Sequence, residues 1–84
     1  MNSKDELLGT IRSVLQELFE IAPERVQPGA HLVDDLGLDS IDAVDLIVRM
    51  QAMTGRKISP ERFRAIRTVE DMVNTVYAVL QEPA

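Results

Sequence analysis

Apolar residues recur at helical spacing near the start of the chain. Over about 4–19 they follow the 3, 4, 7, 8, 11 spacing of one helix face. Ser3, with Glu6 three positions later, forms the pattern of a capping box at the beginning of this stretch. We therefore predict a first helix over about 4–19, with one apolar face: Leu7, Leu8, Ile11, Val14, Leu15, Leu18 and Phe19.

A second helix is predicted over about 40–54. Asp39 or Ser40 can supply its N-cap, and Asp42 in the first turn suits the positive end of the helix dipole. Gly55 fits the stop at its C-terminal end. The spacing places one stripe toward the core, namely Ala43, Leu46, Ile47 and Met50, and leaves a second set half exposed beside charged residues, namely Ile41, Val44 and Val48.

Two further helices are predicted after position 58. Ser59 and Pro60 give an N-cap and a first-turn proline for a short helix over about 60–65. Thr68 and Asp71 form a capping-box pattern that opens a last helix over about 69–81. Three main helices and one short helix, without strand-like alternation, predict an all-α fold: a small four-helix bundle with a long loop between its first two helices.

The segment over 20–39 lacks helical periodicity and contains Pro23, Pro28, Gly29 and Gly37 as breakers. So long a stretch without regular structure is uncommon in a compact domain and is more often functional than idle. Its apolar residues are frequent enough to hold it against a core. We therefore expect a packed loop within a single domain over 1–84, anchored by Ile21, Val26, Leu32, Val33, Leu36 and Leu38.

Composition excludes several classes of protein. The chain contains no cysteine, which removes disulfides and thiolate metal sites. No apolar run approaches the roughly 18 residues of a membrane span, and MNSKDELLGT lacks the basic and then apolar order of a signal peptide. A cytoplasmic protein is the expectation.

The net charge of −5 is distributed unevenly. Over 28–48 there are five aspartates and no Lys or Arg, whereas 49–67 contains six basic residues and a single acidic one, Glu61. Phosphate-backbone binding needs a broad positive surface, and the basic half has no interleaved aromatics. With a pI near 4.7, this pattern argues against nucleic acid as the main partner.

Ser40 is a candidate for an enzymatic nucleophile. A serine hydroxyl needs a positioned base, and G-L-D-S-I is not the G-x-S-x-G elbow of hydrolases. His31 is the one histidine of the chain, and nothing in the sequence directs it toward Ser40. We interpret His31 as an ordinary loop residue and do not favour a hydrolytic triad.

The aspartates could also offer oxygen ligands to a metal ion. Their spacing is not the D-x-D-x-D-G with a closing Glu that an EF-hand requires, so no dedicated metal site is predicted, although loose binding of a divalent cation stays open. Periodicity alone also leaves open a plain alternative, in which Asp39 and Ser40 only cap a helix and the remaining aspartates form a solvated face.

The stretch LGLDSIDAVDLI resembles the attachment motif of the acyl carrier proteins, whose signature is Asp-Ser-Leu or Asp-Ser-Ile at the start of the second helix. The resemblance extends over nearly the whole chain. It includes the long loop, the Ile58-Ser59-Pro60 turn before a short helix, and a last helix opened by Thr68-Val69-Glu70-Asp71.

This resemblance implies that a phosphopantetheinyl transferase attaches 4′-phosphopantetheine from coenzyme A to Ser40, with Asp39 helping to meet the transferase and its Mg²⁺. The chain would be a non-catalytic carrier of acyl thioesters in type II fatty acid or polyketide-like biosynthesis. A ketosynthase and an acyltransferase or ligase would be further partners, and the free chain would be a monomer.

The surface of the second helix is predicted to recognise these partners. Its charge would raise encounter rates with basic partners, while a small apolar centre would give modest affinity and easy release. The residues concerned are Ile41, Asp42, Val44, Asp45, Val48 and Arg49. By resemblance the acyl chain folds back between the helices, with an expected lining of Phe19, Leu46, Met50, Ile58, Ile66 and Val73; core packing is the alternative for Phe19 and Met50.

The chain departs from the common fatty acid carriers where the charge changes sign, between Asp45 and Arg49. The segments RMQAMTGRK and ERFRAIR predict partners with a matching acidic zone, and they are similar to carriers of dedicated bacterial pathways such as those making aryl polyenes. The alternatives that stay open are a peptidyl or alanyl carrier, a helical adaptor whose Ser40 is only a cap, and a small hydrolase.

Overall fold

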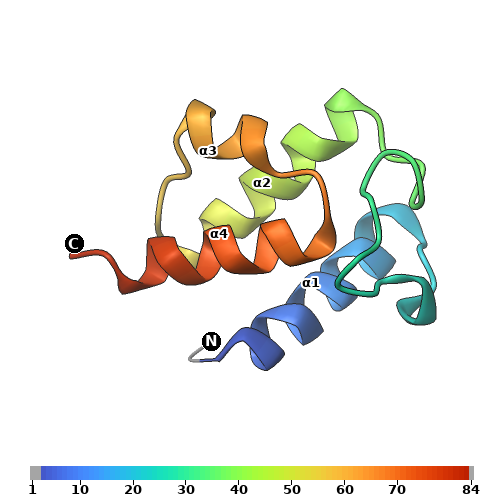
Figure 1. Cartoon of the computed structure of the whole chain (residues 1–84), viewed down its shortest axis with the longest axis horizontal. Helices are drawn as coiled ribbons and strands as arrows, with labels where there is room; N and C mark the ends of the chain where they lie inside the picture. The colour runs from blue at the N-terminus through green and yellow to red at the C-terminus, as the bar shows by residue number, and fades with distance from the viewer. Residues whose placement is uncertain (1–2, 84) are drawn as a thin grey trace.

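The computed structural model describes residues 3–83 and shows a bundle of four α-helices along them (Figure 1). The helices lie where the hydrophobic pattern predicts them, and the all-α bundle is confirmed. Their bounds are α1 (Lys4–Phe19), α2 (Ser40–Thr54), α3 (Pro60–Ala65) and α4 (Val69–Gln81), with a short 3₁₀ helix, η1 (Pro23–Arg25), inside the long loop. The predicted domain limits, residues 1 and 84, lie outside the described part. No helix in that part is long and apolar enough to cross a membrane.

Local capping explains where α1 begins and ends. The Ser3 side chain accepts a hydrogen bond from the Glu6 backbone N–H at 3.1 Å, which makes Ser3 the N-cap of α1. At the other end Glu20 adopts a left-handed conformation (φ 57°) and donates its backbone N–H to Gln16. Of the predicted apolar face, Leu18 lies at the edge and is 37% exposed.

One hydrophobic core joins α1, α2, α4 and the long loop. α1 packs against both α4 and α2, and no polar or charged side chain is buried among residues 3–83. α3 contributes no fully buried residue, and its Phe63 packs only partly against the core. α3 is therefore the most lightly anchored of the four helices. The largest fully buried side chains include Leu7, Ile11, Leu15, Leu46, Met50 and Met72.

The loop between α1 and α2 is packed, as expected, with one correction. Five of its six predicted anchors are buried: Ile21, Val26, Leu32, Leu36 and Leu38. Val33 was expected among them and is 53% exposed. A turn starts at Leu32 and directs the Leu32 side chain inward, so the side chain of the following residue, Val33, points to solvent. The Val33 carbonyl accepts the Gly37 N–H at 3.0 Å.

Backbone hydrogen bonds fasten the same loop to the start of α4. The partners are Leu32 N–H to Arg67 O at 2.9 Å, Val69 N–H to Ala30 O at 2.9 Å, and Glu70 N–H to Pro28 O at 2.8 Å. Figure 1 shows the loop at one end of the bundle, leading directly into the first turn of α2. The start of α2 is thus held by a loop that is itself hydrogen-bonded to another helix.

Candidate functional site

Ser40 is the first residue of α2, and the structure decides which neighbour caps that helix. Asp39 has an extended backbone (φ −95°, ψ −177°), and its Oδ1 accepts the Asp42 backbone N–H at 2.8 Å. Asp42 returns the contact, because its Oδ2 accepts the Asp39 N–H at 3.3 Å. Asp39 is therefore the N-cap, and the Ser40 hydroxyl is not needed for capping.

The Ser40 side chain is exposed, and its hydroxyl has no hydrogen-bond partner among residues 3–83. Within the same residues the backbone N–H groups of Ser40 and Ile41 also lack an acceptor. Unsatisfied N–H groups and the positive end of the macrodipole make the beginning of a helix favourable for an anion. The hydroxyl therefore stands free in a place that suits a phosphate group.

The turn before Ser40 depends on Gly37. Its φ of +74° is a left-handed backbone conformation that residues other than glycine rarely adopt. A Cβ added there would meet nothing within 4 Å, so the requirement comes from the backbone and not from crowding. Leu38 then turns back into the core, where it is 3% exposed, and donates its N–H to Leu32 O at 3.0 Å.

His31 stabilises the loop. Its Nδ1 accepts the Asp34 N–H at 3.2 Å, its backbone N–H donates to Asp35 Oδ2 at 2.7 Å, and it forms an isolated bridge with Thr68. No hydrogen bond joins His31 to Ser40 in the described part of the chain. The contacts of His31 that the structure does show place it within the loop, as the sequence indicated.

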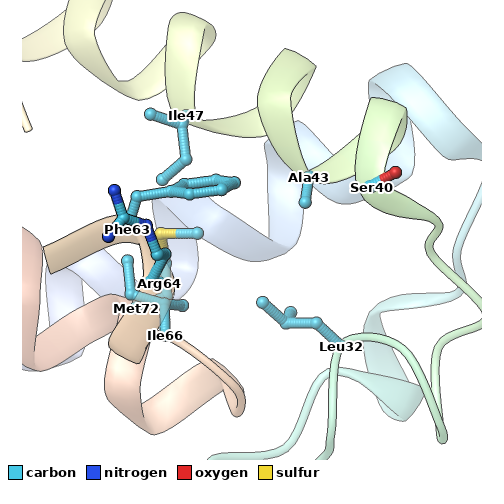
Figure 2. Close-up of a pocket in the computed structure, with 8 residues that line it drawn as sticks. All are labelled: Leu32, Ser40, Ala43, Ile47, Phe63, Arg64, Ile66 and Met72. Atoms are coloured by element: carbon cyan, nitrogen blue, oxygen red, sulfur yellow. The ribbon is translucent and has the colours of Figure 1, made fainter. Parts of the chain in front are cut away.

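A cavity of about 200 Å³ opens beside Ser40 (Figure 2). It lies between α2, α3, the long loop and the first turn of α4, and most of its wall is apolar. The lining residues are Leu32, Ser40, Ala43, Ile47, Phe63, Arg64, Ile66 and Met72.

Only Ile66 belongs both to this cavity and to the acyl lining predicted from the sequence. Leu46 and Met50 are fully buried in the core, with 0% exposure. Phe19 lines a groove between α1 and α2, and Val73 lines a cleft between α1 and α4. Ile58 lines a second cavity next to the first.

The sequence prediction missed six residues of the cavity at Ser40. A helical signal could have found two of them, because Ala43 and Ile47 follow Ser40 at spacings of three and seven on the same face of α2. Phe63 carried no such signal, since its position depends on how α3 packs against α2. The missed residues are Leu32, Ala43, Ile47, Phe63, Arg64 and Met72.

The outer face of α2 presents apolar side chains beside acidic ones. Ile41 is 71% exposed, Val44 49% and Val48 55%, so all three remain accessible. Asp45 is exposed as well, whereas Asp42 is half-buried and occupied in the capping box. We call Ile41, Val44, Asp45 and Val48 the α2 face.

Arg49 does not extend the α2 face as a free cation. Its Nη2 donates to Glu17 Oε2 on α1 at 2.6 Å. This ion pair joins α2 to α1 and offsets the charge of Arg49 locally.

Two more of the basic residues contact the end of α4. Arg62 forms an ion pair with the Glu82 carboxylate, and Arg56 donates to the Glu82 backbone oxygen at 2.8 Å. The hydrogen bond between the two side chains lowers the pKa of Glu82 and raises the pKa of Arg62. Among the described residues of 49–67, no ion pair is formed by Arg56, Lys57, Arg64 and Arg67.

The aspartates of the loop and of α2 do not assemble into a metal centre. Within residues 3–83 no three potential ligands from His, Asp and Glu come together in the geometry needed to hold a metal ion. Asp35, Asp39 and Asp42 instead accept hydrogen bonds from backbone N–H groups.

Comparison with known proteins identifies relatives of this arrangement. Residues 9–76 match the family model described as "Phosphopantetheine attachment site". Acyl carrier protein 2 of Ralstonia nicotianae is 53% identical over 93% of this chain and 96% of its own length. The acyl carrier protein of Thermotoga maritima is 33% identical over 90% of this chain and 94% of its own. The crystal structure of an acyl carrier protein from Thermotoga maritima superposes with a TM-score of 0.83, at 26% identity, over 93% of this chain and 91% of that one.

Proposed function

This chain belongs to the acyl carrier protein family, and on that basis we propose that Ser40 is the residue to which its prosthetic group is attached. The prosthetic group of this family is covalently bound 4′-phosphopantetheine. When bound, it supplies a flexible arm that ends in a thiol, on which acyl groups are held as thioesters. A carrier without cysteine thus obtains its thiol from the group that it carries.

The residues around Ser40 fit this group. The hydroxyl is exposed and unpartnered within residues 3–83, so it is accessible to a modifying enzyme. The free N–H groups of Ser40 and Ile41 and the dipole of α2 favour the negative charge of a phosphodiester at that position. One observation supports the proposal most directly: Asp39 caps the helix, so the Ser40 hydroxyl is left free for modification.

We propose that a phosphopantetheinyl transferase modifies Ser40. In this step the Ser40 oxygen forms a new bond to phosphorus, a bond to phosphorus in coenzyme A breaks, and the remainder of coenzyme A leaves. The hydroxyl proton passes to a base of the transferase, since the described residues place no base at Ser40. Asp39 Oδ1 is occupied by the Asp42 N–H, and Oδ2 accepts no hydrogen bond among residues 3–83, so it can face the Mg²⁺ of the transferase.

Intact-mass analysis after incubation with coenzyme A and a broad-specificity transferase tests this assignment. The wild-type chain should gain the mass of one phosphopantetheine, and Ser40→Ala should gain none. Ser59→Ala is the matched control, because Ser59 is another exposed serine at the beginning of a helix, and it should be modified normally. Modification of Ser40→Ala, or no modification of the wild type, would contradict the proposal.

We further propose that acyl-processing enzymes, such as a ketosynthase and an acyltransferase or ligase, dock on the α2 face. Asp45 would attract a basic partner surface, and Val44 and Val48 would supply a small apolar contact. Asp45→Lys should slow loading several-fold, with a smaller effect at high salt. Glu24→Lys has the same change of charge on an exposed residue of η1 and should load at the wild-type rate; equal slowing of both variants would argue against a specific face.

The partners are proposed to be dedicated enzymes of a type II fatty acid or polyketide-like pathway. Within 49–67, the cations Lys57, Arg64 and Arg67 form neither an ion pair nor a side-chain hydrogen bond among the described residues, and they would meet a complementary acidic zone on these partners. Turnover by a housekeeping ketosynthase should be slower than by the cognate enzyme, and equal efficiency would contradict the idea. The cytoplasmic location expected from the sequence stays a prediction.

A further inference from the structure

Phe63 stands between two neighbouring cavities. The first begins at Ser40 and has a volume of about 200 Å³. The second, of about 280 Å³, is more open to solvent than the first and lies further along α2 and toward the α2–α3 connection. Ile47 and Phe63 line both cavities. The second is otherwise lined by Val44, Val48, Gln51, Ile58 and Pro60.

The position of the ring explains why the first cavity ends there. Figure 2 shows Phe63 projecting from α3 beneath Ile47 of α2, with its ring aimed toward Ala43 and the Ser40 end. The guanidinium of Arg64 lies on the side of Phe63 away from Ser40 (Figure 2). A chain entering from Ser40 therefore meets apolar walls and then an aromatic ring.

The volume of the first cavity limits what it can hold. A protein cavity of about 150 Å³ lined by apolar side chains holds benzene, with its six carbon atoms. At the same packing, the cavity of about 200 Å³ beside Ser40 accommodates roughly eight carbon atoms. If the wall were removed, the two cavities of about 200 and 280 Å³ together would accept a chain roughly twice as long.

We propose that Phe63 sets the length of the acyl chain that this protein shelters, with the limit at roughly eight carbon atoms. The substrate class is then short and medium apolar acyl groups. This inference rests on the proposed attachment at Ser40 and deepens it. One side chain of α3 then limits the length of the acyl chain that the protein can enclose.

The same side chain can be changed without dismantling the core. α3 has no fully buried residue, and Phe63 is only partly buried. The helix is held by the Ser59 cap and by the contact of Arg62 with Glu82, which do not involve the ring. Phe63→Ala should therefore open the wall while α1, α2 and α4 keep their packing.

The proposal is tested by loading Ser40 with acyl-phosphopantetheine groups of increasing even carbon number. The thioester of each loaded protein is then cleaved with hydroxylamine. The cleavage rate, followed by intact mass, reports the fraction of thioester that is exposed. Each methylene inside the cavity should lower that rate about fourfold, and each one beyond it should change nothing. The wild-type rate should level off at roughly eight carbons, and that of Phe63→Ala at roughly twice that length. The chemical shift of the Met72 methyl group should level off at the same chain length as the rate.

Phe19→Ala is the matched control, because it removes the other phenylalanine of the chain, which is also partly buried but lines the groove between α1 and α2. The cleavage rate of Phe19→Ala should level off at the same chain length as that of the wild type. An unchanged limit in Phe63→Ala, or an equal shift in Phe19→Ala, overturns the proposal. If Phe63→Ala does not fold, Phe63→Leu should move the limit in the same direction, and no movement there overturns it. Failure of loading at Ser40 would instead contradict the proposed function.

Discussion

Asp39 has two tasks, and two substitutions separate them. It caps α2 through the bond from the Asp42 N–H to Oδ1 at 2.8 Å, and we propose that its charge meets the transferase. Asp39→Ala removes both the cap and the charge. Asp39→Asn keeps an oxygen in the capping position and removes the charge.

The expected sizes of these effects follow from the capping geometry. Loss of an N-cap costs about 1 kcal/mol, within a range of about 0.5–2 kcal/mol. A chain of this length has a total stability of roughly 4–13 kcal/mol, so the loss is large enough to measure. It corresponds to a decrease in Tm of about 4–8 °C for each kcal/mol. Asn caps helices about as well as Asp, so Asp39→Asn should lose less than about 1 kcal/mol, mainly through the weaker interaction with the helix dipole.

Urea unfolding, monitored by circular dichroism, measures the capping contribution. The initial rate of phosphopantetheine loading measures the interaction with the transferase independently. Asp39→Ala should be less stable and load slowly, whereas Asp39→Asn should be nearly as stable as the wild type and still load slowly. Ser59→Ala provides a control for cap loss elsewhere, because Ser59 caps α3, and it should load normally.

Two results would refute this reasoning separately. Wild-type stability of Asp39→Ala would show that the capping bond contributes nothing measurable. Wild-type loading of Asp39→Asn would show that the transferase does not use the charge of this carboxylate.

Three further predictions concern stability. Leu46→Ala should lower the free energy of unfolding by about 2–5 kcal/mol, since Leu46 is fully buried; a loss below 1 kcal/mol in urea would contradict the packing. A double-mutant cycle of Arg49 and Glu17 should give a coupling under about 1 kcal/mol that decreases with salt, because the pair is partly exposed; salt-independent coupling would argue against it. The backbone N–H groups of Arg67 and Thr68 lower the pKa of Asp71. A pKa that is lower in the folded state stabilises the fold above the unfolded pKa, and this contribution is lost as the pH falls below about 4. Asp71→Asn should therefore reduce the loss of stability between pH 7 and acid, and an unchanged acid limb would refute this.

Much of the fold could be predicted because the signals that set helix ends are short-range. A capping bond joins residues three positions apart, as between Thr68 and Asp71 or between Ser3 and Glu6. The sequence left one such choice open at the start of α2. Asp and Ser are comparable N-caps, so only the extended backbone of Asp39 decided between Asp39 and Ser40.

The surroundings of Ser40 could be predicted only in part, because they combine distant segments. The position of Ser40 at the beginning of a helix follows from local sequence, and Ala43 and Ile47 follow from helical spacing. The opposite wall does not, since Phe63 reaches the cavity only when α3 packs against α2. The partner of Arg49 is likewise on α1, 32 positions away.

By itself, then, the sequence determined the helices, the packed character of the loop and the position of Ser40 at the beginning of a helix, because each depends on residues within a few positions of one another. The tertiary structure alone decided that Val33 faces solvent, that Arg49 pairs with Glu17 and that Phe63 lines the cavity beside Ser40. These features depend on how separate segments pack against one another, and the spacing of residues along the chain does not encode that contact directly.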